Sequence, residues 1–529
     1  MRDRHQPGRS AVMAADAMAA TSQPLATEAA LQILRGGGNA LDAAVAASAV
    51  LAVVEPYSTG IGGDCFILYH EAASGKLHAL NGSGAAAAAA SVDALRELGF
   101  DSMPERGIHS VTVPGAIDAW FEACESLGKL GFDRVLQAAI DYAENGFAVS
   151  PVIASVWSEF APVLAETAEA SAAYLVDGKA PAAGSIHRQP DLARTLRLIA
   201  ERGRDGFYLG EIAAEIIRYS DSQGGLLTLE DLASHRSEWV EPLGSRYRGY
   251  DLFEIPPNGQ GITAQIMLNI LGQTDVAQYP HLGPDHVHLL SEAFTLAIAE
   301  RDRFVADRKF AEPPVEQLLS DEFAREQFAR IDMQRAMPQP LDSALPRHKD
   351  TVYLSVVDKD RNACSLINST FFSWGSGLVA GSTGINLHNR GSGFRLDPDH
   401  FNRIEPGKRP MHTIIPAMLY RDGKPVLSFG VMGADYQAMG QAYVLTNWID
   451  HGMDIQQAID APRFTLYDGL LAVERGVPAA TCEALAARGH RVAEVESPHG
   501  GGQAVMIDWD RGVLHGGSDP RKDGCAAGY

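Results

Sequence analysis

Apolar residues recur at helical spacing in the first part of the chain. Residues 26–34 show the three- and four-residue spacing of an amphipathic helix, and Gly36, Gly37 and Gly38 then end it. A second, alanine-rich helix is predicted from about Leu41, and its small side chains favour close packing in a buried layer. The glycine-rich turn "STGIGGD" leads into a predicted strand, and "GKLHALNG" predicts another.

The middle of the chain alternates between helical and strand patterns. Residues 113–236 are mostly helical, strand character returns in "RYRGYDLFEI", and a helix follows near Thr263. A long helix is predicted over residues 284–307. Residues 311–350 are rich in proline and charge and lack firm periodicity. We therefore expect them to form an exposed connecting segment of the kind that tolerates chain cleavage.

Strand patterns dominate after residue 351. Alternating positions predict strands in "TVYLSVVD", "NACSLINSTF", "AMLYRDGKPVLSFGV" and "GQAVMIDWDRGVLHGG", with hairpin turns at "DKDRN" and "RDGK". Helices are predicted over residues 437–451 and 455–461. Since helices flank strands in both halves, the sequence predicts an α+β protein with sheets inside and helices outside.

Composition narrows the possible partners and the compartment. The 529 residues carry a formal net charge of −22, which argues against nucleic acid or an anionic membrane as the main partner. Five widely spaced cysteines without a CxxC motif argue against a disulfide framework or a cysteine zinc site. The N-terminus lacks a signal-peptide core, and no apolar run reaches membrane-span length. We expect a cytoplasmic protein without metal or cofactor.

Thr351 is the first candidate for chemistry, because it directly follows Asp350 at the start of a predicted strand. A threonine hydroxyl becomes a useful nucleophile when a base takes its proton, and an N-terminal threonine carries that base as its own α-amine. The amine has an unperturbed pKa of roughly 7.7–8.0, near working pH. Thr351 would gain this amine only if the Asp350–Thr351 bond were cut. The alternative interpretation is an ordinary loop residue that begins a strand.

Several motifs, in order along nearly the whole chain, resemble the γ-glutamyltransferase family of self-cleaving N-terminal-nucleophile hydrolases. They are "STGIGGD", "TVPGAIDAW", "IPPNGQGITAQIMLNIL", "DTVYLSVVDKDRNA", "PGKRPMHTIIPAM", "AIDAPRF" and "GGSDPRKDGCAAGY". The resemblance implies a four-layer αββα sandwich, one domain made of two chains after self-cleavage. Residues 1–350 would form the large chain and residues 351–529 the small chain, which has 529 − 350 = 179 residues.

The resemblance also implies which residues act in catalysis. It places the nucleophile at Thr351, with the cut between Asp350 and Thr351, and a second hydroxyl that orients the nucleophile at Ser369. The oxyanion hole falls on Gly433 and Ala434, where the family has two glycines. Backbone N–H groups serve there, so alanine is acceptable, and such donors contribute about 3–4 kcal/mol to the transition state.

The residues that read a glutamyl group in the family are changed in this chain. Ser83 stands where an arginine is expected for the α-carboxylate, and Gly393 replaces the aspartate that holds the α-amine. A buried ammonium without an acceptor is costly. Arg390, in place of a glutamine, offers a fork suited to a carboxylate, with pairing to a surface aspartate as the alternative.

Other expected polar positions have also changed. Phe371 replaces an asparagine, and His412 and Thr413 replace two adjacent serines, which makes both candidates for contact with substrate. His412 is also open to interpretation as a structural wall residue, because the N-terminal amine already supplies the base. Asp435 is expected to cap the helix that follows it.

These features leave three functional hypotheses. The first is a self-processing amidohydrolase or acyltransferase that cleaves γ-glutamyl amides, as in glutathione metabolism. The second is hydrolysis of a small carboxylate-bearing amide such as oxamate with release of ammonia, as in the oxamate amidohydrolase and acylase-like members that the chain resembles. The third is a non-enzymatic, uncleaved binding relative. Each enzyme hypothesis implies a small-molecule amide substrate and pairing of the two chains, with a homodimer left open.

Overall fold

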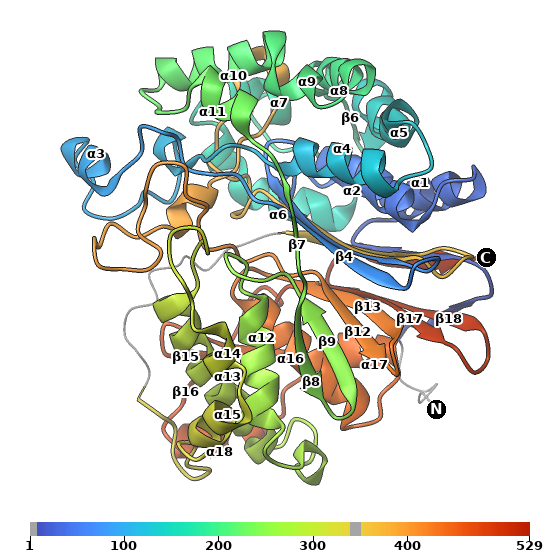
Figure 1. Cartoon of the computed structure of the whole chain (residues 1–529), viewed down its shortest axis with the longest axis vertical. Helices are drawn as coiled ribbons and strands as arrows, with labels where there is room; N and C mark the ends of the chain where they lie inside the picture. The colour runs from blue at the N-terminus through green and yellow to red at the C-terminus, as the bar shows by residue number, and fades with distance from the viewer. Residues whose placement is uncertain (1–7, 339–350) are drawn as a thin grey trace.

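Two seven-stranded sheets lie face to face in the centre of the molecule, with helices on both outer sides (Figure 1). The structure is a computed structural model that describes residues 8–338 and 351–529. One sheet has the strand order β1-β18-β17-β13-β12-β9-β8 and the other β19-β2-β10-β11-β3-β4-β7. The helix–sheet–sheet–helix layering confirms the α+β class and the four-layer sandwich expected from the sequence.

Every pairing within these two sheets is antiparallel. The strands of the first sheet are β1 (Val12–Ala14), β18 (Val513–Ser518), β17 (Gly501–Asp508), β13 (Lys424–Met432), β12 (Ala417–Arg421), β9 (Tyr250–Glu254) and β8 (Leu243–Tyr247). Those of the second are β19 (Cys525–Gly528), β2 (Met18–Thr21), β10 (Val352–Val357), β11 (Ala363–Ser369), β3 (Asp64–Glu71), β4 (Lys76–Gly82) and β7 (Glu238–Val240). Two small sheets consist of β14 (Phe464–Tyr467), β15 (Leu470–Val473) and β16 (Arg491–Glu494), and of β5 (Phe147–Ala148) and β6 (Ile186–His187).

The helices form two outer layers. On the side of the second sheet are α1 (Pro24–Arg35), α2 (Ala40–Val54), α3 (Val92–Glu97), α4 (Ala116–Leu127), α5 (Phe132–Asn145), α6 (Pro151–Leu164), α7 (Ala168–Tyr174), α8 (Pro190–Arg202), α9 (Asp205–Tyr208), α10 (Gly210–Ser222) and α11 (Leu229–Ser234). On the side of the first sheet are α12 (Gly261–Leu271), α13 (Pro284–Phe304), α14 (Val315–Leu318), α15 (Asp321–Phe328), α16 (Tyr436–Ile449), α17 (Ile455–Asp460) and α18 (Ala479–Ala487).

Helix α2 shows why the alanine-rich segment forms a buried layer. Each of its fifteen residues is buried, and Asn39 begins the helix with a reciprocal capping box that includes Asp42. The helix packs on β10 and β11, so small side chains let its backbone approach the sheet closely. This confirms the buried helix pair predicted from the spacing of apolar residues.

Strands from both sides of residue 350 share each sheet. In the second sheet β10 pairs with β2 on one side and with β11 on the other, and β11 pairs with β3. In the first sheet β12 pairs with β9, and β18 pairs with β1. A cut before Thr351 would therefore leave two chains joined by shared sheets and a common core rather than two separable domains.

The segment of residues 311–350 differs in part from its predicted form. Two helices, α14 and α15, lie within it, and Leu318, Phe323 and Phe328 pack against the core beneath α12 and α13. The apolar positions are too few and the helices too short for the pattern to be evident beside the prolines and charges. Residues 339–350, which include Asp350, lie outside the described residues.

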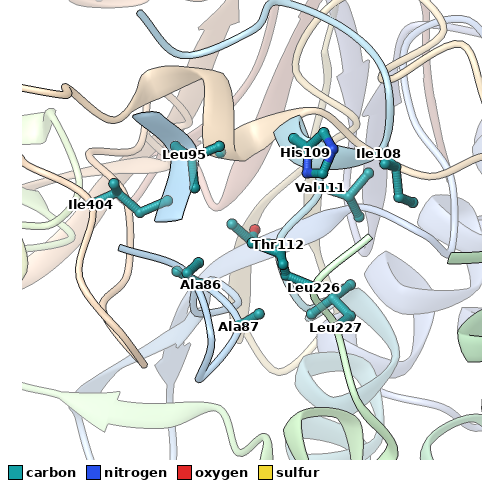
Figure 2. Close-up of a pocket in the computed structure, with 12 residues that line it drawn as sticks. Ala86, Ala87, Leu95, Ile108, His109, Val111, Thr112, Leu226, Leu227 and Ile404 are labelled. Carbon is teal, nitrogen blue, oxygen red and sulfur yellow. The ribbon is translucent and has the colours of Figure 1, made fainter. Parts of the chain in front are cut away.

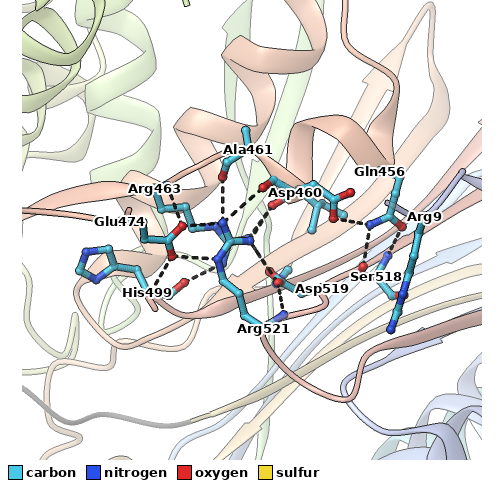
Figure 3. A network of polar contacts seen from close by, with 12 residues as sticks. Arg9, Gln456, Asp460, Ala461, Arg463, Glu474, His499, Ser518, Asp519 and Arg521 are labelled. Atoms are coloured by element: carbon cyan, nitrogen blue, oxygen red, sulfur yellow. Dashed lines mark hydrogen bonds and ion pairs between the residues drawn. The ribbon is translucent and has the colours of Figure 1, made fainter. Parts of the chain in front are cut away.

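Two of the motifs that carry the family resemblance meet in space. Arg463 of "AIDAPRF" places its Nη2 atom 2.5 Å from Asp519 of "GGSDPRKDG", and both side chains are buried (Figure 3). Arg521 reaches Glu474 at 2.6 Å, from Nη2 to Oε2. These paired charges hold the end of β18 against the turn after α17.

None of the helices in the described part of the chain combines the length and apolar character needed to span a bilayer.

Candidate active site

Thr351 and Ser369 face each other at one end of the central hairpin. Ser369 ends β11 and Thr351 immediately precedes β10, whose Val352 is opposite Asn368 in the antiparallel register. The two side-chain oxygens, Oγ1 of Thr351 and Oγ of Ser369, lie 3.0 Å apart, and both residues are buried. The backbone N–H of Phe371 donates to Ser369 Oγ at 2.9 Å. The structure thus brings together the predicted nucleophile and its predicted orienting hydroxyl.

Gly433 and Ala434 form the turn between β13 and α16. Gly433 has φ of 120° and Ala434 has φ of 50°, a left-handed conformation that is uncommon for a residue with a side chain. Neither backbone N–H donates a hydrogen bond to any residue that the structure describes. Ala434 packs against Phe371 and Phe372, which places the turn beside the Ser369 end of the hairpin. Two free amide donors in a strained turn suit an oxyanion hole.

Arg390 is a buried cation beside these residues. Its exposed fraction is 0%, and its guanidinium carbon lies 3.8 Å from the centre of the Phe371 ring. Nη1 donates to Thr413 Oγ1 at 2.8 Å, whereas Nε and Nη2 have no hydrogen-bond partner among the described residues. Burial lowers the pKa of Arg390 to about 9, against the opposing charges of Asp64 and Asp435, so it stays protonated at neutral pH. The surface-aspartate alternative is wrong for this side chain, because it is not at the surface.

Gln260 links Thr413 to the Ala434 turn. Its Nε2 donates to the carbonyl oxygens of Thr413 and Ala434, each at 2.8 Å, and its Oε1 accepts from Arg301 Nη1 at 2.8 Å. Arg301 Nη1 also lies 2.5 Å from Asp435 Oδ1. Asp435 makes no side-chain cap to α16, so the predicted helix-capping role is wrong and this contact with a buried arginine stands in its place.

His412 makes a hydrogen bond with the buried carboxylate of Asp64, which is opposite Ser369 in the sheet. Its Nε2 is 3.0 Å from Asp64 Oδ2, and His388 Nδ1 is 3.4 Å from the same oxygen. Burial lowers the pKa of His412 to about 3. Burial alone would raise the pKa of Asp64, but its contacts with His388 and His412 outweigh that effect and hold the pKa of Asp64 well below its usual range. This geometry fits the structural interpretation of His412, and contact with substrate stays a prediction.

Sequence reasoning missed four residues that support the site: Asp64, Gln260, Arg301 and His388. Asp64 and Gln260 lie within the quoted motifs "STGIGGD" and "IPPNGQG", so the motifs held a signal for them. Arg301 and His388 meet the site only through the tertiary fold. Ser83, where the family has an arginine, is buried and accepts a hydrogen bond from Asn258 Nδ2 at 3.1 Å.

A small cavity with mostly apolar lining residues adjoins Gly391, the neighbour of Arg390 in sequence (Figure 2). Its lining residues are Ala86, Ala87, Ala90, Leu95, Ile108, His109, Val111, Thr112, Leu226, Leu227, Gly391 and Ile404. Gly391 belongs to the short turn Arg390–Gly393. None of the predicted catalytic residues is among the described residues that line this cavity. The cavity is therefore next to the candidate active site and is not part of it.

The fold and this arrangement define the class of N-terminal-nucleophile hydrolases. Residues 26–529 match the model of the family described as gamma-glutamyltranspeptidase. The chain therefore belongs to the gamma-glutamyltranspeptidase family, which confirms the resemblance read from its motifs.

The similar proteins are named for different enzymatic activities. The chain is 40% identical to the glutathione hydrolase-like YwrD proenzyme of Bacillus subtilis, over 95% of this chain and 97% of that protein. It is 36% identical to the oxamate amidohydrolase proenzyme of Klebsiella pneumoniae, over 97% and 98%. The crystal structure of cephalosporin acylase from Bacillus halodurans superposes with a TM-score of 0.94 at 41% identity, covering 100% of this chain and 98% of that one. The chain is thus an enzyme of a family of amide hydrolases and acyltransferases.

Proposed function

We propose that the chain cuts itself before Thr351 and then uses Thr351 as an N-terminal nucleophile on amide bonds. The hydroxyl attacks the substrate carbonyl while the new α-amine takes its proton. An ester to Thr351 forms, the C–N bond breaks, and the departing nitrogen receives the proton. Water then attacks the ester and releases the acid, restoring the threonine. Ser369 supports the nucleophile through its 3.0 Å contact.

Gly433 and Ala434 are proposed to hold the oxyanion of this reaction. Their N–H groups lie in a turn that packs against Phe371, whose own N–H bonds to Ser369. Gln260 fixes the carbonyl of Ala434 and so fixes the peptide plane that follows it. A preformed donor pair in a buried site stabilises the charge that develops in the transition state.

The substrate that the site supports best is a small amide whose acyl part carries a carboxylate. One observation carries this proposal: Arg390 is wholly buried and charged, yet two of its nitrogens have no partner among the described residues. A buried guanidinium without an anion is costly, and a carboxylate is the group that its planar fork pairs with best. The similarity to an oxamate amidohydrolase supports this class of substrate.

A γ-glutamyl amide is the second candidate, favoured by the family match over residues 26–529. Such a substrate also brings an α-ammonium, which needs an acceptor when buried. At the position of the expected aspartate stands Gly393, which supplies no carboxylate. The carboxylate of a glutamyl group would suit Arg390, but its ammonium lacks the counterpart that the family pattern leads one to expect.

The two candidates differ in a direct assay. Purified protein is given oxamate, succinamate and γ-glutamyl-p-nitroanilide, with release of ammonia or nitroaniline followed, and with butyramide as an amide of similar size without charge. We expect the highest kcat/KM for an amide with a carboxylate and no ammonium. A preference for γ-glutamyl-p-nitroanilide over both carboxylate amides would instead establish the second candidate.

Arg390→Gln tests the role of the guanidinium in the same assay. Loss of a charged hydrogen bond costs about 1.5–3 kcal/mol, so kcat/KM for the carboxylate amides should fall roughly 10- to 100-fold. Butyramide hydrolysis should change little, because it makes no use of the positive charge. Thr413→Val, which removes only the hydroxyl that Arg390 contacts, serves as the matched control. Equal losses for charged and neutral amides in Arg390→Gln would contradict the proposal.

A further inference from the structure

Two histidines and a glutamate gather away from the candidate active site, on the first-sheet side of the molecule. His288 and Glu292 are four residues apart on α13 and therefore lie on one face of that helix. His490 comes from the short connection between α18 and β16. His288 Nδ1 lies 2.7 Å from His490 Nε2, and Glu292 Oε1 lies 3.9 Å from the same nitrogen. One ligand atom from each residue lies within 4.8 Å of the other two.

The surroundings direct a lone pair of His288 and one oxygen of Glu292 into the cluster. His288 Nε2 lies 3.0 Å from the backbone carbonyl oxygen of Asp332. Because a carbonyl oxygen only accepts hydrogen bonds, Nε2 carries the proton and Nδ1 of the neutral ring carries the lone pair. Glu292 Oε2 accepts from the N–H of Met337 at 2.9 Å. Its other oxygen, Oε1, is buried and has no hydrogen-bond partner in the part of the chain that the structure describes. Metal-binding histidines commonly show this donation to a carbonyl.

The three side chains of the cluster are shielded from solvent. His288 and Glu292 are 0% exposed, and His490 is 6% exposed. Two imidazoles and one carboxylate are a donor set that suits Zn²⁺.

We propose that His288, Glu292 and His490 bind a divalent transition-metal ion of the zinc type, with a water molecule as the fourth ligand. Zinc–nitrogen bonds of about 2.0–2.1 Å in a tetrahedral site place two nitrogens roughly 3.3 Å apart. The ring nitrogens at 2.7 Å therefore need to separate by only a fraction of an ångström as the metal enters between them and the proton of His490 moves from Nε2 to Nδ1. This departs from the expectation of a metal-free protein that was drawn from the sequence.

The site joins three parts of the chain. The carbonyl of Asp332 and the N–H of Met337 connect the segment after α15 to the ligands on α13, and the N–H of Ala336 bonds to the carbonyl of Arg488 near His490. If the chain is cut before Thr351, which rests on the proposed function, two ligands belong to the large chain and one to the small chain. The ion would then hold the two chains together.

Metal binding is measurable on the full-length protein. Protein treated with a chelator and freed of it is titrated with Zn²⁺ in competition with a chromophoric chelator, and Co²⁺ is added separately to record its visible absorption. We expect one site per chain that binds tightly, a tetrahedral Co²⁺ spectrum, and a higher unfolding temperature with Zn²⁺. Glu292→Gln and His490→Ala should each weaken Zn²⁺ binding at least about 10-fold.

Two controls separate this proposal from other effects. His70→Ala removes another buried histidine, one that contacts Tyr420 at 2.8 Å, and should leave Zn²⁺ binding unchanged. Thr351→Ala should bind Zn²⁺ as the wild type does even if it is never cut, so failure of processing and failure of metal binding are distinguishable. Wild-type protein that binds no Zn²⁺, or Glu292→Gln and His490→Ala variants that bind it equally well, would overturn the proposal.

Discussion

The hydroxyl oxygens of Thr351 and Ser369 lie 3.0 Å apart, at the paired ends of two central strands. The hairpin fixes this distance through its register. Val352 and Asn368 are opposed in the antiparallel ladder, and Thr351 precedes Val352 while Ser369 follows Asn368, so Thr351 and Ser369 face each other. Ser369 in turn accepts the backbone N–H of Phe371. The candidate nucleophile is thus positioned by sheet register rather than by a mobile loop.

Ser369→Ala tests the role of this contact. Loss of the hydroxyl removes a partner from Thr351 and leaves the buried N–H of Phe371 without its acceptor, a cost of about 1–3 kcal/mol. We expect kcat to fall roughly 10- to 100-fold in steady-state assays of amide hydrolysis. Ser369→Thr, which keeps a hydroxyl, should retain most of the activity. Wild-type kcat in Ser369→Ala would rule out an orienting role.

Ala434→Gly tests whether the predicted oxyanion hole uses only the backbone. The left-handed φ of 50° costs alanine about 1–2 kcal/mol, and glycine avoids this cost but loses about 0.4–1 kcal/mol through its freer unfolded chain. Stability should therefore stay the same or rise, by up to about 1.6 kcal/mol, and kcat should stay within a few-fold. A large loss of kcat with normal thermal stability would show that the Ala434 methyl group, rather than its N–H, matters for the reaction.

Arg301→Met tests the charge network that supports the Ala434 turn. Removal of Arg301 takes a buried partner from Asp435 and from Gln260 Oε1, and such losses cost about 3–5 kcal/mol. We expect a clear drop in the urea midpoint of unfolding. Arg246→Met removes a similar charge from an exposed side chain and serves as the control. Equal midpoints for the two variants would refute the structural role of Arg301.

Stability should fall as the solution becomes acidic, over a window set by buried histidines. Burial lowers the pKa of several of them to about 4, including His70, His187 and His499, whereas an unfolded histidine titrates near 6.5. Between these values the unfolded chain binds more protons, so stability decreases as pH falls from about 6.5 toward 4. Each such histidine contributes up to about 1.4 kcal/mol per pH unit. Urea unfolding at a series of pH values measures this slope, and a flat profile would contradict it.

The layers and most elements of this fold could be predicted from the sequence because its hydrophobic patterns are local. The hairpins around "DKDRN" and "RDGK" and the buried, alanine-rich helix α2 are examples, and each is present as expected. Helices α14 and α15 escaped prediction, since their short apolar faces lie among prolines and charges. Local pattern was sufficient where an element was long or had a clear turn.

The residues of the candidate site also differ in whether a local sequence signal could predict them. Thr351 was a candidate because it starts a recognisable strand, whereas Ser369 and the turn at Gly433 were predicted only from the family resemblance. Arg301 was not predictable, since it reaches the site from the last turns of a long helix and meets Asp435 more than a hundred positions away in sequence. The burial of Arg390 also depends on packing from distant segments, and the sequence could indicate only its charge.

Intact-mass analysis of the purified wild-type protein, with N-terminal sequencing of each fragment, tests the central claim most directly. Self-cleavage before Thr351 predicts two polypeptides, the smaller with 529 − 350 = 179 residues and threonine at its N-terminus, and a single uncut chain for Thr351→Ala. Full-length polypeptide alone in a preparation that hydrolyses amides would contradict an N-terminal threonine nucleophile.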